Sequence, residues 1–221
     1  YETNAYSSSA TLQSKMNTIS SAYSELSKSR SEYVQFYMKN HEQIPTWIMI
    51  KVVNFSTFID VLHNSKTNVT HAICKLYSMY DDNNLPNVKL LIGSLHWLRR
   101  VRNSCAHNER VYCIHQTQAR NNSASGRILD PYYTQLPTSY SRCTEKNIFD
   151  ILVYFKYFLP TEEFTPMIIE LKNMLIELQN TLQTNAFDNV RGQMGIKNLN
   201  VLDALIALPK SKIEYHKFDT L

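Results

Sequence analysis

Residues 97–112 read WLRRVRNSCAHNERVY, and the rest of the chain is organised around this stretch. Through it and just upstream, apolar residues recur at steps of three or four, the spacing that gives a helix one apolar face: Leu91, Leu95, Leu98, Val101 and Cys105. We therefore predict a helix over about 87–113, called the motif helix, whose apolar face packs into a core. Arg102 and His107 lie five positions apart, so at about 100° per residue they diverge by roughly 140° around that helix.

The remaining chain has the same helical periodicity and contains neither internal repeats nor convincing alternating strands. These patterns predict an all-α protein, a helical bundle. An irregular loop is expected over about 117–140, after the motif helix, and C-terminal helices over about 146–208. The 221 residues are enough for one substantial core, so we predict a single helical domain over 1–221.

Prolines suggest where two of these helices begin. Pro45 precedes a long apolar segment, which predicts a helix running to about Leu62, although its β-branched residues also permit a strand. Thr165 followed by Pro166 predicts a second helix start, with Thr165 as the N-cap and Pro166 in the first helical position.

Composition excludes several classes of protein. The 4 glycines form neither GxxxxGK[ST] nor GxGxxG, so we expect no nucleotide-driven motor. The 4 cysteines, in a chain of this length without a signal peptide, indicate a reducing cytosol rather than disulfides. The longest apolar run, 148–159, contains Asp150 and Lys156 and is shorter than the roughly 18 residues that span a bilayer. We therefore predict a soluble cytoplasmic protein with no membrane association.

A zinc site is also not expected, although Cys105, His107, Cys113 and His115 lie close together in the sequence. Each Cys-x-His pair is two positions apart, which on a helix directs the side chains to opposite sides. We predict no metal ligands.

Positive charge is concentrated around the motif helix. The whole chain carries a formal net charge of +4. Between residues 83 and 129 there are seven cationic side chains against the single carboxylate of Glu109: Lys89, Arg99, Arg100, Arg102, Arg110, Arg120 and Arg127. Such a local surplus is typical of a surface that binds a phosphate backbone. A solvated helix face is the alternative interpretation.

Three segments resemble one known family. The string RNSCAHNER at 102–110 is similar to the RNxCAHxxR signature of the Abi-like (abortive infection, AbiD/AbiF type) proteins. Within it, Arg102, Asn103 and His107 look like the Arg-polar-x3-His motif of HEPN ribonucleases. The runs IPTWIMIKVVNFSTF at 44–58 and VRGQMGIKN at 190–198 resemble further elements of the same family. The resemblance implies an HEPN-like helical bundle, with helix rather than strand after Pro45. It also implies a helical segment upstream, so we expect the N-terminal part of the gene product to be missing before Tyr1.

The resemblance also implies a function, namely a metal-independent endoribonuclease toxin of bacterial phage defence. The implied catalytic residues are Arg102, Asn103 and His107, without a cofactor. The chemistry suits the residues, because an imidazole titrates near pH 6.5 and can both take and give a proton, whereas an arginine stays charged and can hold a phosphate. Asn103, four positions before His107, could bond the imidazole and fix its tautomer.

The expected partners are RNA and a second copy of the chain. Some proteins of this type resemble toxins restrained by a structured small noncoding RNA, and we expect such a partner here. Six cations are predicted to contact RNA: Lys89, Arg99, Arg100, Arg110, Arg120 and Arg127. The resemblance further implies a homodimer that pairs two motif helices. Such pairing would bring Arg102 and His107 into one site although they diverge on a single helix. A non-catalytic RNA-binding protein and a helical protein-protein adaptor remain open.

Overall fold

The structure is a computed structural model that describes residues 11–81, 83–117, 136 and 145–209. Within these residues the fold is all-α apart from one two-residue antiparallel ladder and one isolated bridge between Tyr80 and Pro86, which confirms the predicted fold class. The chain divides into two compact units, an N-terminal unit (Tyr1–Ile73) and a C-terminal unit (Cys74–Leu221), and each is described here by itself. The prediction of a single domain over 1–221 stays a prediction.

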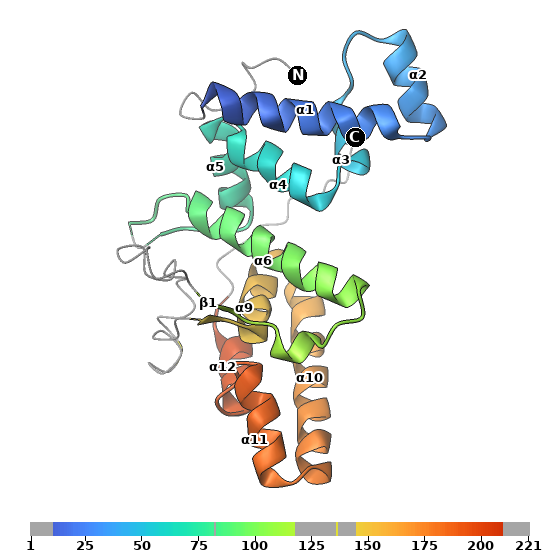
Figure 1. Cartoon of the computed structure of the whole chain (residues 1–221). Coiled ribbons are helices and arrows are strands. Elements are labelled where there is room, and N and C mark those ends of the chain that lie inside the picture. Colours follow the sequence, from blue (N-terminus) through green and yellow to red (C-terminus); the bar gives the residue numbers. More distant parts are fainter. Residues whose placement is uncertain (1–10, 82, 118–135, 137–144, 210–221) are drawn as a thin grey trace. The chain divides into compact units, whose positions relative to one another are not determined.

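The N-terminal unit is built from short helices, coloured blue to teal in Figure 1. They are α1 (Leu12–Lys28), α2 (Glu32–Asn40), α3 (Thr46–Val52), α4 (Phe55–Asn64) and the first part of α5 (Thr67–Leu76). Helix α1 packs against α3 and α4. One core cluster consists of buried aliphatic side chains from α1, α2, α3 and the C-cap of α3: Ala22, Leu26, Val34, Ile48, Met49 and Val53.

The single helix predicted from Pro45 to about Leu62 is wrong, because the structure breaks it into α3 and α4. Asn54 caps α4 by accepting a hydrogen bond from the Thr57 amide at 3.0 Å. The carboxylate of Glu25 accepts from the Asn54 amide at 2.5 Å, from its side-chain nitrogen at 2.6 Å and from the Thr57 hydroxyl at 2.5 Å. The cap and its carboxylate partner together satisfy the donors at the start of α4, so a new helix begins there.

The C-terminal unit contains the motif helix and the helices that follow it. Its elements are α6 (Val88–Ala106), η2 (Val111–Cys113), β1 (Gln116–Thr117), β2 (Glu145–Lys146), α9 (Ile148–Phe158), α10 (Thr161–Thr181), α11 (Thr184–Gln193) and α12 (Asn200–Ala207). Helix α10 packs against α9, α11 and α12, which lie beside it in Figure 1, and α6 packs against α9. Strands β1 and β2 pair Gln116 with Lys146 and Thr117 with Glu145. The irregular loop predicted over about 117–140 lies, apart from Thr117 and Leu136, outside the described residues.

Helix α10 begins earlier than the sequence predicted. Its first residue is Thr161, with Pro160 at the N-cap, and Pro166 lies inside the helix rather than at its start. A proline inside a helix has no N–H to donate, which normally breaks the helix. Here the burial of Phe164 and Ile168, one on each side of the proline, holds the continuous helix against the core.

The buried face of α6 also differs in part from the predicted stripe. Leu91 and Leu95 are buried as expected, but Cys105 is exposed. Trp97 and Ser104, which the stripe omitted, are buried instead. The real face is rotated by about one residue, because a bulky tryptophan buries more area than the small thiol at position 105.

Candidate functional site

The motif helix ends at Ala106, so the prediction that it continues to about 113 is wrong. His107 occupies the C-cap, and its backbone N–H donates to the carbonyl of Asn103 at 3.0 Å. The next residue, Asn108, has a φ of +55° and returns its N–H to the carbonyl of Cys105 at 3.1 Å. Asparagine tolerates this left-handed conformation better than most residues and commonly terminates helices. The His107 side chain is thereby presented, exposed, at the end of α6.

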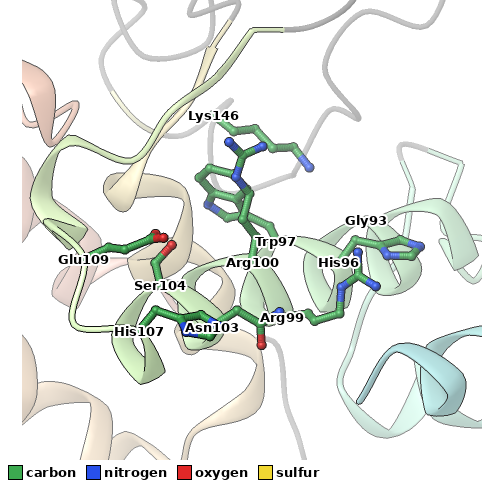
Figure 2. Close-up of a pocket in the computed structure, with 10 residues that line it drawn as sticks. All are labelled: Gly93, His96, Trp97, Arg99, Arg100, Asn103, Ser104, His107, Glu109 and Lys146. Atoms are coloured by element: carbon green, nitrogen blue, oxygen red, sulfur yellow. The ribbon is translucent and has the colours of Figure 1, made fainter. Parts of the chain in front are cut away.

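A hollow of about 550 Å³, called the α6 pocket, lies along one face of this helix. Figure 2 shows His96, Arg99, Asn103 and His107 in a row along the helix, whereas the Arg100 side chain extends past Trp97 toward Lys146. Glu109 from the segment after α6 and Lys146 from β2 complete the lining, together with Trp97 and Ser104. A volume of this size falls within the range of small-ligand sites, about 300–1,000 Å³.

The three predicted catalytic residues occupy different positions around this pocket. Asn103 and His107 line it, whereas Arg102 does not. Arg102 instead donates a hydrogen bond from Nη1 to Oδ1 of Asn103 at 3.1 Å. The expected bond between the Asn103 amide and the imidazole is therefore replaced, on the amide oxygen, by a bond to Arg102.

The six predicted RNA-binding cations separate into three groups. Arg99 and Arg100 line the α6 pocket. Lys89 and Arg110 are exposed outside it. Arg120 and Arg127 lie outside the described residues. The positive surplus read from the sequence is therefore represented inside the pocket by two adjacent arginines.

Charge in the α6 pocket is predominantly positive. Arg99, Arg100 and Lys146 contribute three permanent cations, and Glu109 contributes the one carboxylate among the described residues that line it. Cations arranged around a hollow attract phosphate and stabilise charge that develops on it. The arrangement therefore suits an anionic ligand of nucleotide size.

Sequence reasoning missed several of these lining residues, among them His96 and Lys146. His96 lies seven positions before Asn103, which is about two helical turns, so extending the polar face backwards along α6 would have found it. Lys146 had no such signal. Its place depends on the pairing of Gln116 with Lys146, which joins two segments far apart in the sequence.

Trp97 anchors the floor of the pocket to the C-terminal helices. The side chain is only 2% exposed, and its Nε1–H donates to the carbonyl of Asn147 at 3.1 Å. Asn147 caps α9 with a reciprocal pair of bonds, accepting from the amide of Phe149 and donating its own N–H to Asp150. Gly195, with a φ of +78°, lies so close to the Asn147 side chain that a Cβ would overlap it. The VRGQMGIKN segment thus supports the motif helix from behind.

The described ranges contain neither a cluster of metal ligands nor a candidate membrane span. No three His, Cys, Asp or Glu side chains gather there as they would around a metal ion. None of the helices in the same ranges has the length and apolar character needed to cross a membrane.

Comparison with known proteins gives one match. A family model described as Abi-like protein matches residues 1–113, just over half of the 221 residues. The matched range includes the whole of α6, with Arg102, Asn103 and His107 at its end. Neither the curated proteins nor the solved structures give a match.

Proposed function

Because this chain belongs to the Abi-like protein family, we propose that it is a phage-defence protein of the abortive-infection kind that acts by cutting RNA. The observation that supports this most is the α6 pocket, where the imidazole of His107 shares a hollow with Arg99, Arg100 and Lys146. An imidazole can move protons at cellular pH, and the cations can hold a phosphodiester. These are the groups that cleavage of RNA by its own 2′-hydroxyl requires.

In the proposed reaction, the ribose 2′-oxygen attacks the adjacent phosphorus and the bond from phosphorus to the 5′-oxygen breaks. Neutral His107 takes the proton from the 2′-hydroxyl, and the imidazolium formed in this way gives a proton to the departing 5′-oxygen. The products are a 2′,3′-cyclic phosphate and a 5′-hydroxyl. A guanidinium stays charged and can stabilise the extra negative charge on the phosphorane oxygens, so a metal ion is not needed.

Arg102 enters this scheme through a second protomer. It lies outside the pocket of its own chain, on a part of α6 that diverges from His107 by roughly 140° at about 100° per residue. A two-fold interface presents the same patch from both partners. We propose that two motif helices face each other, so that Arg102 of one protomer holds the phosphate beside His107 of the other.

The partner that restrains the activity is proposed to be a structured small noncoding RNA. Lys89 and Arg110 are exposed cations outside the pocket, and we propose that they contact its phosphates. Binding through phosphates should weaken steeply as salt rises, because each neutralised phosphate releases counterions. A protein-protein adaptor would have no need of this charge distribution.

A non-catalytic RNA-binding protein is the second candidate, because a single chain does not bring Arg102 into its own pocket. Incubating the purified protein with total RNA in the presence of a chelator, and then sequencing both product ends, separates the two. The proposal predicts new 5′-hydroxyl and 2′,3′-cyclic phosphate ends. RNA that is bound but stays intact would support the second candidate, and cleavage that strictly requires a divalent metal would contradict the proposed reaction.

A further inference from the structure

The two ends of the α6 pocket carry opposite charge, and we infer that the pocket holds the RNA strand on one side of the cleaved bond only. This inference rests on the proposed function, since it takes His107 to mark the position of the scissile phosphate. Toward the start of α6 the lining is cationic, with Arg99, Arg100 and Lys146. Beyond His107 the lining is Glu109.

The cationic end is separated from His107 by more than one nucleotide. Arg100 and Arg99 precede His107 by seven and eight residues, which corresponds to about 10–12 Å along a helix that rises about 1.5 Å per residue. Measured along the axis of a stacked strand, successive phosphates are separated by a rise of about 3.4 Å. The arginines are therefore placed for a phosphate about three stacked nucleotides from the scissile one, or fewer in a stretched strand.

The cations at this end have defined positions. The guanidinium carbon of Arg100 lies 5.6 Å from the ring centroid of Trp97, and that ring is buried and bonded to Asn147. Lys146 directly precedes Asn147 and is paired with Gln116 in the ladder. Groups that are already positioned lose less conformational freedom when they bind a ligand, so their contacts contribute more to affinity.

The opposite end disfavours a phosphate. Helix α6 ends there, and the carbonyls of a helix C-terminus carry a partial negative charge. The backbone N–H of Glu109 donates to the carbonyl of Ser104 at 2.9 Å, which keeps Glu109 beside the helix end. A strand that continued past His107 in this direction would bring its phosphates toward the Glu109 carboxylate and the negative end of the α6 dipole.

The predicted substrate is therefore a single strand with at least about three nucleotides on one side of the cleaved bond and as little as one nucleoside on the other. The strand direction, 5′ or 3′, is left to measurement. Lys146, Arg99 and Arg100 are positioning residues in this account, because they contact the strand away from the reacting atoms.

The test uses oligonucleotides that contain one ribonucleotide in an otherwise deoxy strand, so that the cleavage site is fixed. Nucleotides are removed from either end in turn, and kcat/KM is measured with the wild-type chain. Shortening one side to a single nucleoside should change kcat/KM by less than about threefold, whereas shortening the other should lower it at least tenfold, as expected for a lost hydrogen bond to a charged group.

Two variants connect this asymmetry to the pocket. Lys146→Ala and Arg100→Ala should each reduce kcat/KM on the long substrate. In these variants, shortening the longer side should cause little further loss of kcat/KM. Lys39→Ala, which removes an exposed cation from α2, should keep the wild-type length dependence. Equal sensitivity on both sides, or an unchanged length dependence in Lys146→Ala, would overturn the inference.

Binding of the same oligonucleotides to the His107→Ala chain gives a readout without cleavage. Affinity should show the same one-sided length dependence, because the cationic end of the pocket is intact in that variant. If long RNA is cut in a His107-dependent way but kcat/KM and affinity depend equally on both sides, the inference of one-sided strand binding is wrong and the proposed function stands. If no RNA is cut while affinity depends on one side only, the α6 pocket is a one-sided binding site for the strand and the ribonuclease proposal fails.

Discussion

Arg102 donates a hydrogen bond from Nη1 to Oδ1 of Asn103 at 3.1 Å, so the two motif residues are joined although only Asn103 lines the α6 pocket. Both side chains are exposed, and a bond of this kind contributes modestly to stability. Its importance is therefore geometric. The bond joins the guanidinium to the amide of a residue that lines the pocket.

Substitution of Asn103 separates two roles for its amide. Asn103→Leu removes the acceptor for Arg102 and should lower kcat for RNA cleavage about tenfold, in line with losing one hydrogen bond to a charged group. Asn103→Asp keeps an acceptor and adds a negative charge. If Asn103 acts by orienting Arg102, the Asp variant should recover most of the rate, whereas a direct contact with phosphate predicts that Asp is worse than Leu. Thermal unfolding should be nearly unchanged in both variants.

Mixing variant protomers tests the composite site. Chains carrying Arg102→Ala and chains carrying His107→Ala should each be inactive alone, because each site lacks one group. After mixing and exchange, heterodimers contain one complete site, so about a quarter of wild-type activity should return if protomers pair at random and half of all dimers are mixed. No recovery, together with full activity of a monomeric wild-type chain in sedimentation, would contradict the paired arrangement.

The support behind the motif helix gives a stability prediction with an internal control. Gly195→Ala places a Cβ against the Asn147 side chain at a φ of +78°, so it should cost at least about 1–3 kcal/mol. Gly192→Ala adds a Cβ in α11 with no atom within 4 Å, where alanine favours the helix. Thermal unfolding should show a midpoint lowered by several degrees for the first and unchanged or raised for the second. Equal midpoints would mean that Gly195 does not hold the cap of α9.

Cysteine reactivity provides a check on the described burial. Burial raises the pKa of Cys74 to about 11 from a usual value of 9.0, because the charged thiolate is desolvated. The folded chain therefore holds almost no Cys74 thiolate at neutral pH, and a thiol-alkylating reagent should leave this residue unmodified while it labels exposed Cys105. Peptide mapping after brief labelling at pH 7 measures both. Rapid labelling of Cys74 in the native state would show that the burial is wrong.

Parts of the fold were accessible from sequence because they depend on local periodicity. The all-α class and the C-terminal helices over about 146–208 followed from apolar spacing. The predicted helix boundaries were wrong where a residue distant in the sequence determines them. Asn54 begins a new helix with the help of Glu25, whose carboxylate lies on α1, and no local pattern reveals that contact.

The candidate site was also partly accessible. Asn103 and His107 line one pocket, as their spacing of four on a helix allows. The end of α6 at Ala106 was missed, because it depends on the left-handed conformation of Asn108 rather than on hydrophobic period. Lys146 was missed because its position is set by strand pairing across the irregular segment.

The most direct test of the proposed function is the rate at which a short single-stranded RNA is cut under single-turnover conditions with a chelator present. Wild-type protein and His107→Ala are compared at matched concentration, after thermal unfolding and RNA affinity are shown to be equal. The account predicts that the variant binds RNA normally and cuts it at least about 100-fold more slowly, as expected for losing a group that transfers a proton in the transition state. A His107→Ala chain that cuts RNA at the wild-type rate would contradict it.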